Sequence, residues 1–143
     1  MPKDTVVATK PETAVTRGVI PYINLNGASS DAAAFYQRAF GAAEIGRVPA
    51  EDPKRLMHCH LEINGGSLMM GDGCPSQEGS EGISRSVVMQ LVVSDADMWW
   101  KRAIDAGCEV VMPLEVMFWG DRYGQLKDPF GVYWAMDEPA RQK

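Results

Sequence analysis

The sequence predicts an α+β protein built from two consecutive copies of one β-α-β-β-β module. Three observations predict this fold: two stretches of similar pattern, an amphipathic helical stripe in each, and a glycine turn between two strand-like runs in each. Leu126 follows Leu61 by 65 positions, and the residues around these two leucines match in pattern. Similarity over this length is an internal repeat, which strongly constrains the fold. Because each copy alone would bury little apolar surface, we expect the two copies to share one core.

The repeat is clearest at the two glycine turns. In the second copy the turn is DPFG, residues Asp128–Gly131. Proline presets φ at the second turn position, and glycine accepts the φ > 0 that closes the turn. In the first copy Gly65-Gly66 occupies the corresponding place. The matched positions are Leu61 with Leu126, Gly66 with Gly131, and Asp72 with Asp137.

The first copy begins with a strand at residues 19–25, followed by a helix that ends at Gly41. Apolar residues recur in this helix at i, i+3, i+4, i+7 and i+8, which is typical of one buried helical face. A strand at 43–48 and two strands around Gly65-Gly66 complete the copy. The candidate N-caps are Ser29, Ser30 and Asp31, and the apolar stripe is Ala32, Phe35, Tyr36, Ala39 and Phe40.

The second copy repeats this order. A strand at 86–93 precedes a helix that ends at Gly107, and a strand at 108–112 follows. Residues 113–120 are expected to form a long apolar loop. The last two strands flank DPFG, and the second of them, 132–136, is apolar throughout, as in a strand buried on both faces. The candidate N-caps are Ser94 and Asp95, and the helical stripe is Ala96, Trp99, Trp100, Ala103 and Ile104.

The repeat and the composition between its copies predict one domain. The chain is expected to consist of a flexible arm at 1–17, this domain at 18–138 and a tail at 139–143. Within the domain, a linker rich in Gly, Ser and Glu at 74–84 joins the modules at 18–73 and 85–138.

Composition excludes several functional classes. The chain has 143 residues, is 45% hydrophobic and carries a net charge of −5, so nucleic acid and anionic membranes are not expected partners. The longest apolar run, 86–93, is too short to span a bilayer, and residues 1–16 lack the apolar segment of a signal peptide. Three cysteines, Cys59, Cys74 and Cys108, are odd in number and lack metal-type spacing. A reduced, cytoplasmic setting is therefore expected.

Several motifs in this order resemble the vicinal oxygen chelate superfamily, which includes glyoxalase I, extradiol dioxygenases and bleomycin-resistance proteins, and within it the PhnB-like branch. The resemblance covers about 19–137, and it depends on the order and spacing of the motifs together. The motifs are Pro21-Tyr22, Phe35-Tyr36, Phe40-Gly41-Ala42, His58, the run FWGDRYG at 118–124, and DPFG.

The resemblance implies that the two modules form one eight-stranded open barrel around a cavity, in a homodimer. Metal enzymes of the superfamily hold a divalent ion with four side chains from the first and last strands of each module. Carried over by position, none of the four places in this chain holds a histidine or glutamate. No metal or other cofactor is therefore expected at the usual site. The four places are Pro21 or Tyr22, Met69 or Met70, Val88 or Gln90, and Ala135.

A second possible metal site lies on one predicted strand. His58, His60 and Glu62 alternate and so point to one face, while Met57, Cys59, Leu61 and Ile63 point to the other. Two imidazoles and a carboxylate are the ligands of a facial metal triad. Ligands at alternate positions of a straight strand are about 7 Å apart, however, which suits one ion poorly. The other interpretation is a polar strip that lines the cavity, with His58 and His60 contacting a ligand.

Aromatic residues gather in or beside the long second loop. Phe118, Trp119 and Tyr123 are placed to stack on a flat ligand. The other interpretation is that Phe118 and Trp119 close the barrel mouth or form a dimer contact. Cys59 points away from the histidines, so no Cys-His nucleophile is predicted, nor is a Ser-His-Asp arrangement.

We therefore expect a metal-free protein that binds an apolar or aromatic small molecule in the barrel cavity, like the bleomycin-resistance proteins. The alternatives are a metal-dependent lyase, isomerase or dioxygenase with a displaced site, and an interaction module with a filled barrel. Whether the protein is an enzyme stays open, and no catalytic residue is assigned. Asn24 is expected to point into the cavity, as Tyr22 and Gln90 do. Glu115 and Asp72 are the carboxylates expected nearest the cavity rim. The expected ligand contacts are Tyr22, His58, His60, Met70, Gln90, Phe118, Trp119 and Tyr123.

Overall fold

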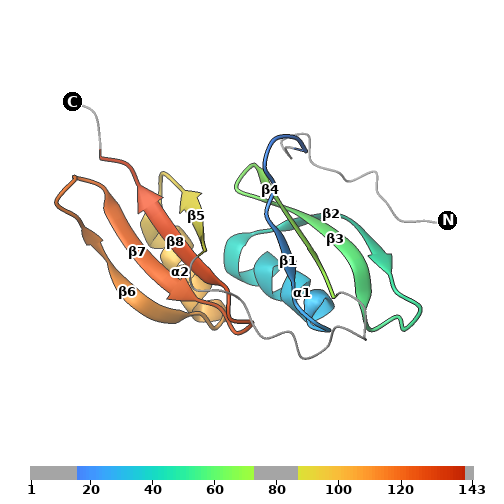
Figure 1. Ribbon diagram of the computed structural model, residues 1–143. Coiled ribbons are helices and arrows are strands. Elements are labelled where there is room, and N and C mark those ends of the chain that lie inside the picture. Colours follow the sequence, from blue (N-terminus) through green and yellow to red (C-terminus); the bar gives the residue numbers. More distant parts are fainter. Residues whose placement is uncertain (1–15, 73–86, 141–143) are drawn as a thin grey trace. The chain divides into compact units, whose positions relative to one another are not determined.

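The computed structural model describes residues 16–72 and 87–140, which form two compact units. The predicted linker and nearly all of the predicted arm lie outside the described residues. Unit 1 contains β1 to β4 and most of α1, and unit 2 contains β5 to β8 and α2 (Figure 1). No helix of the described residues is long and apolar enough to cross a membrane.

Unit 1 is a four-stranded mixed sheet with one helix. The strand order is β1-β4-β3-β2, in which β1 and β4 are parallel and the other neighbours antiparallel. The elements are β1 (Tyr22–Asn24), α1 (Ser29–Phe40), β2 (Ala43–Pro49), β3 (Leu56–Ile63) and β4 (Gly66–Gly71).

Unit 2 has the same topology. Its strand order is β5-β8-β7-β6, again with one parallel pair, between β5 and β8. The predicted α+β class and the repeat of one β-α-β-β-β module are therefore confirmed. The elements are β5 (Val88–Val92), α2 (Ala96–Ala106), β6 (Glu109–Val116), β7 (Arg122–Lys127) and β8 (Tyr133–Glu138).

The register corrects the predicted repeat alignment after the glycine turns. The Leu25 amide donates to the Gly71 carbonyl (2.9 Å), and the Val93 amide donates to the Asp137 carbonyl (3.0 Å). Gly71 is thus the counterpart of Asp137, which makes Glu138 the counterpart of Asp72. The pairing of Asp72 with Asp137 is wrong because the second turn is one residue longer, as the pairs Leu61–Leu68 and Leu126–Trp134 show.

The start of α1 also differs from the prediction. Ala28 is the N-cap and makes no side-chain capping bond, so Ser29, Ser30 and Asp31 do not cap this helix. Asp72, distant in sequence, supplies the acceptor instead: its Oδ1 accepts from the amides of Gly27 (2.8 Å) and Ser29 (2.9 Å). These amides point out of the first turn without an intrahelical partner, so any nearby carboxylate can bind them.

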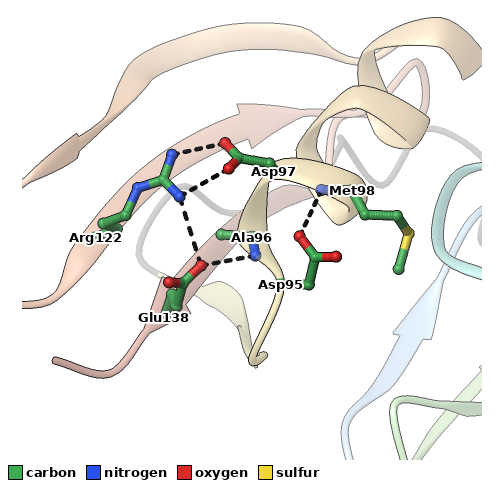
Figure 2. Close-up of polar contacts among 6 residues, drawn as sticks. All are labelled: Asp95, Ala96, Asp97, Met98, Arg122 and Glu138. Atoms are coloured by element: carbon green, nitrogen blue, oxygen red, sulfur yellow. Dashed lines mark hydrogen bonds and ion pairs between the residues drawn. The ribbon is translucent and has the colours of Figure 1, made fainter. Parts of the chain in front are cut away.

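The predicted start of α2 is confirmed at Asp95, whose carboxylate accepts from the Met98 amide (3.2 Å). Figure 2 shows a second carboxylate at this helix end: Glu138 accepts from the Ala96 amide (2.9 Å). Both helices therefore receive a carboxylate from the residue that ends, or directly follows, the last strand of their own unit.

The loop predicted at 113–120 is shorter than expected, because β6 continues through Pro113 to Val116. β6 is the edge strand of its sheet, and its pairing with β7 has register shifts between Val110 and Met112 and between Met112 and Glu115. An edge strand tolerates a proline because the missing amide has no ladder partner to lose. The sequence pattern of a loop and that of an irregular edge strand are alike at this point.

The core of each unit lies between its sheet and its helix. In unit 2, Gly124 shows how close this packing is: an added Cβ would lie 2.7 Å from the Trp100 ring. Side chains alternate across a strand, so each sheet also has a face turned away from its helix, which we call the open face. Register places these residues on the open faces: Tyr22, Asn24, His60, Glu62, Ser67 and Met69 in unit 1, and Gln90, Val92, Tyr123, Gln125, Ala135 and Asp137 in unit 2.

Candidate functional site

Tyr22 and His58, both predicted site residues, meet on the open face of unit 1. The Tyr22 hydroxyl donates to the Met57 carbonyl (3.2 Å) and lies 3.3 Å from His58 Nδ1. Their ring centroids are 5.7 Å apart. Gly71 makes this possible, because a Cβ there would lie 2.9 Å from the Tyr22 hydroxyl and 2.8 Å from the Met57 carbonyl oxygen. Sequence reasoning did not single out Gly71, since glycine at a strand end has many uses.

His60 and Glu62 do not converge with His58 on one point. His60 is buried, and its Nε2 lies 2.8 Å from the Ser67 hydroxyl oxygen. The Glu62 carboxylate accepts from the Gly65 amide at the turn. No group of three or more His, Cys, Asp or Glu side chains in residues 16–72 and 87–140 could hold a metal ion. The displaced triad thus gains no support from the described structure.

Met70 lies in the core rather than on the open face. It is fully buried, and its register partners are Ile23 on β1 and Cys59 on β3. Its neighbour Met69 instead shares a row with Tyr22 and His60. The sequence did not show which of Met69 and Met70 faces the core, because a strand that is apolar on both faces has no alternation of polar and apolar residues. The prediction that Met57 points to the apolar face is also wrong, since it is exposed beside a register irregularity of β3.

Asp72 is a buried structural carboxylate, not a residue of the cavity rim. Besides the two amides before α1, it accepts from the Leu56 amide at Oδ2 (2.8 Å). Burial raises the pKa of Asp72, but the hydrogen bonds from Leu56, Ser29 and Gly27 outweigh burial and leave the pKa below its ordinary value. An ionised carboxylate therefore holds the start of α1 to the start of β3.

The two described cysteines are unreactive in the folded protein. Burial raises the pKa of the Cys59 thiol to about 12. Burial, and to a lesser extent the charge of Asp128, raises the pKa of the Cys108 thiol to about 12 as well. Only a thiolate is a good nucleophile, so neither cysteine has the properties of a catalytic one.

In unit 2 the predicted aromatic residues form one cluster, which we call the aromatic corner: Phe118, Trp119 and Tyr123. Edge-to-face contacts join them, with ring centroids 4.9 Å apart for Phe118–Trp119 and 5.7 Å apart for Trp119–Tyr123. Phe118 is 98% exposed and Trp119 is 50% exposed. The amide of Gln125 donates to the Tyr123 hydroxyl (3.0 Å), which fixes the orientation of that ring. The corner therefore adjoins the open face of unit 2, where Tyr123 lies.

Gln90 lies on the same open face, one row from Tyr123. Register places it beside Ala135, which in turn lies beside Gln125. Ala135 is buried, and its methyl group cannot bind an ion, so this position, where the resemblance in sequence implies a metal ligand in the metal enzymes, supplies none. Two amide side chains on either side of a methyl group make a surface suited to hydrogen bonds with a ligand.

Two carboxylates beside the aromatic corner were not predicted. Asp137 shares a row with Tyr123, and its Oδ1 is buried with no hydrogen-bond partner in the described part of the chain. Burial raises the pKa of Asp137, and so do a side-chain hydrogen bond with the Asp121 carboxyl group and the charge of that group. Counting alternate positions forward from the DPFG turn would have placed Asp137 on this face. The proximity of Asp121 depends on how the chain folds back after β8.

The fold and these sites define a class of protein: two tandem β-α-β-β-β modules, each with a helix on one side of its sheet and an open face on the other. The model of the Glyoxalase/Bleomycin resistance protein/Dioxygenase superfamily matches residues 23–136, and the chain belongs to this superfamily. The resemblance seen in the sequence motifs is thereby confirmed.

The chain is also similar to individual proteins. The Mycobacterium bovis protein Mb0911c is 41% identical over 128 residues, covering 85% of this chain and 83% of that protein. The crystal structure of TioX from Micromonospora sp. ML1 is similar with a TM-score of 0.68 and 25% identity, over 89% of this chain and 99% of TioX. The crystal structure of PA1353 from Pseudomonas aeruginosa has a TM-score of 0.72 and 27% identity, over 88% of this chain and 100% of PA1353.

The likeness of fold extends to the structure titled "Putative 3-demethylubiquinone-9 3-methyltransferase, PhnB protein, from Bacillus cereus". It has a TM-score of 0.65 and 16% identity, over 86% of this chain and all of that one. At this identity, the comparison shows the shared fold alone.

Proposed function

We propose that this protein binds an apolar or aromatic small molecule without a metal ion. The proposal includes the expectation that the sheets form one eight-stranded open barrel, that its cavity holds the ligand and that the chain is a homodimer. The observation that carries the proposal is the exposed aromatic corner next to the polar row of Gln90 and Gln125.

The aromatic corner has the properties of a binding surface. Large aromatic side chains exposed side by side are uncommon on a soluble surface unless they contact a partner or ligand. Phe118 and Trp119 are exposed even though they contact each other edge to face. Trp119 also contacts Tyr123, which Gln125 holds, so a flat ligand would meet rings that are already ordered. Such preorganisation lowers the entropic cost of binding.

A metal-dependent lyase, isomerase or dioxygenase is the second candidate function, and no observation in residues 16–72 and 87–140 favours it. A vicinal oxygen pair would need an ion held by converging ligands. Tyr22, Ser67 and Gly65 are instead the separate partners of His58, His60 and Glu62.

The proposal is tested by titrating the protein with flat aromatic compounds in a calorimeter. We expect at least one compound to bind, and Trp119→Ala to weaken its binding about tenfold or more through lost ring contact. Met98→Ala is the matched control, since Met98 is an exposed apolar residue on α2, away from the open face. Equal loss of affinity in both variants would show that the aromatic corner is not the binding site.

Metal content distinguishes the two candidates. The tag-free protein is dialysed against Ni, Zn, Mn and Fe(II), and elemental analysis is expected to find no stoichiometric metal. A retained metal that is lost in His58→Ala would support the enzyme and contradict metal-free binding.

A further inference from the structure

We propose that Asp121 is the positioning residue of the aromatic corner. By holding the turn between β6 and β7 against the chain that leaves β8, Asp121 fixes the rings of Phe118 and Trp119 for a ligand. This inference rests on the proposed function and deepens it, because it names the residue that controls the order of the same binding surface.

Phe118 and Trp119 both lie in the turn that joins β6 to β7. Two backbone hydrogen bonds close this turn: the Met117 amide donates to the Asp121 carbonyl (2.8 Å), and the Gly120 amide donates to the Met117 carbonyl (2.8 Å). Gly120 has a φ of 102°, in the left-handed region that favours glycine. These bonds give the turn its shape, but both of them lie within it. The orientation of the turn relative to the sheet therefore depends on contact with a further segment.

The chain that leaves β8 supplies this contact. Asp121 Oδ1 accepts a hydrogen bond from the Ala140 amide (2.9 Å), and Ala140 comes two residues after the end of β8. The two segments approach closely, since an added Cβ on Gly120 would lie 3.4 Å from the Ala140 Cβ. The register of β7 with β8 ends at the pair Arg122–Glu138. A side chain therefore continues, beyond the last pair of the sheet, the contact that backbone bonds make within it.

Asp121 also reaches the row that holds the third ring of the corner. Its carboxyl group forms a side-chain hydrogen bond with Asp137, which lies beside Tyr123 in the register of β7 and β8. Tyr123 in turn contacts Trp119 edge to face. Two carboxyl groups share such a bond only while one of them holds a proton, whereas the bond from the Ala140 amide needs no proton on either acid. The Ala140 bond is therefore the one that carries the positioning role.

Arg122, the next residue, has a different task. Its guanidinium binds Asp97 at 2.7 and 3.1 Å and lies 3.6 Å from Glu138 (Figure 2). Arg122 thus ties the start of β7 to the first turn of α2, while Asp121 ties the turn before β7 to the segment after β8. The two neighbouring residues can therefore be tested separately.

Burial does little to order the two rings of the turn. Phe118 is almost fully exposed and Trp119 is half exposed, so their order depends on edge-to-face contacts and on the turn that carries them. A side chain that moves in the free protein loses that freedom when a ligand binds, and this loss lowers the affinity. A turn held by Asp121 has its order before the ligand arrives.

Fluorine NMR of the full-length protein labelled with 5-fluorotryptophan tests this role without a ligand. The sequence has four tryptophans, and the variant Trp119→Phe identifies the Trp119 resonance. In Asp121→Ala this resonance is expected to move towards that of free 5-fluorotryptophan while the other three stay, because only the turn loses a bond. Asp121→Asn keeps an oxygen that accepts from the Ala140 amide, so it should retain the wild-type resonance.

The other end of the same hydrogen bond provides an independent variant. Ala140→Pro removes the amide donor and leaves Asp121 unchanged, so it should reproduce the effect of Asp121→Ala, whereas Ala140→Gly keeps the donor and should not. Asp52→Ala is the matched control: Asp52 is an exposed loop residue of unit 1 whose Oδ1 accepts from the Lys54 amide (3.0 Å). This control should leave the Trp119 resonance in place.

Calorimetric titration with a flat aromatic compound that binds the wild type measures the consequence for binding. Asp121→Ala and Ala140→Pro are expected to weaken binding about fivefold, and Asp121→Asn less than about twofold. Equal affinity of the wild type and both weakened variants would overturn the positioning role, even if the compound binds well.

The NMR outcomes separate this inference from the function on which it rests. An unchanged Trp119 resonance in Asp121→Ala and Ala140→Pro would overturn the positioning role. Movement of all four resonances in both variants would overturn it too, because Asp121 would then stabilise unit 2 as a whole. Movement of the Trp119 resonance alone, with no aromatic compound bound by the wild type, would support the positioning of the rings and contradict the proposed function.

Discussion

Asp72 is the residue on which the local structure of unit 1 depends most. Its carboxylate accepts three backbone amides, from Gly27, Ser29 and Leu56, and its own carbonyl accepts from Arg55 (2.7 Å). These amides come from two segments far apart in sequence, so one side chain fixes the entry to α1 and the start of β3. A hydrogen bond to a charged group is stronger than a neutral one, and its loss leaves buried donors unpaired.

Replacing Asp72 is expected to destabilise the protein in a pH-dependent way. Asp72→Ala should lower the free energy of unfolding by about 3 kcal/mol or more, because three backbone amides, two of them buried, lose a charged acceptor. The folded-state pKa lies below the ordinary 3.8, so this stabilisation is present above pH 3.8 and disappears as the pH falls through the folded-state pKa.

Urea unfolding of the wild type and the variant over a range of pH measures both effects. Asp31→Ala, an exposed acid in the first turn of the same helix, is the control and should cost less than about 1 kcal/mol. A difference in stability between wild type and Asp72→Ala that stayed constant down to pH 2 would contradict the role of the ionised carboxylate.

Asp137 is expected to show the opposite pH dependence. Its folded-state pKa is raised, so ionisation is harder in the folded than in the unfolded protein, and the charged form destabilises the fold. Asp137→Asn should therefore raise the melting temperature at pH 7, and the gain should vanish as the pH falls below about 4, where both states bind the proton. Thermal unfolding at several pH values without ligand checks this. A variant less stable than the wild type at pH 7 would show that the ionised carboxylate has a favourable partner.

At the scale of elements, the contact of α2 with its sheet depends on a glycine. Gly124 in β7 leaves room for Trp100, and an added Cβ would also lie 2.9 Å from the Leu114 backbone on β6. Gly124→Ala must move either a large ring in the core or a neighbouring strand, and we expect it to cost about 2 kcal/mol.

Gly46→Ala is the matched control for this prediction. Gly46 lies in β2, and a Cβ there would meet no atom within 4 Å. It should change the free energy of unfolding by about 0.5 kcal/mol or less. Similar losses for both glycines, measured by urea unfolding, would mean that strand propensity rather than the Trp100 contact sets the cost.

At the scale of the whole molecule, the repeat predicts two units that unfold together. All four tryptophans of the sequence, Trp99, Trp100, Trp119 and Trp134, belong to unit 2, so tryptophan fluorescence reports on that unit alone, while far-ultraviolet circular dichroism reports on both. If the modules share one core, the two signals should give the same urea midpoint, as in two-state unfolding. Two separate midpoints would show that each unit is stable by itself.

The expected homodimer belongs to the same scale. Light scattering coupled to gel filtration should give twice the mass of one chain. Pro113 and the irregular pairing of β6 with β7 disfavour extension of the sheet by a second copy along β6. A mass of one chain would contradict the dimer without affecting the proposed binding site.

The sequence by itself determined the α+β class, the repeat, both helices and the glycines that end them. These features follow from local periodicity and from residues whose backbone preferences are strong, such as Gly41, whose φ is 67°. Clustering of Phe118, Trp119 and Tyr123 was also predictable, because the three lie close together in sequence. The absence of a usual ligand at Ala135 followed from the DPFG register.

Only the tertiary structure decided which acids and methionines belong to which face. Asp72 and Asp137 have the same sequence context, each after an apolar strand, yet one is satisfied by three amides and the other shares a side-chain hydrogen bond with the Asp121 carboxyl. The difference comes from one extra residue in the second turn, which shifts the register by one and so turns every following side chain to the other face. Met69 and Met70 were ambiguous for the same reason: a strand buried on both faces shows no alternation from which its phase could be read.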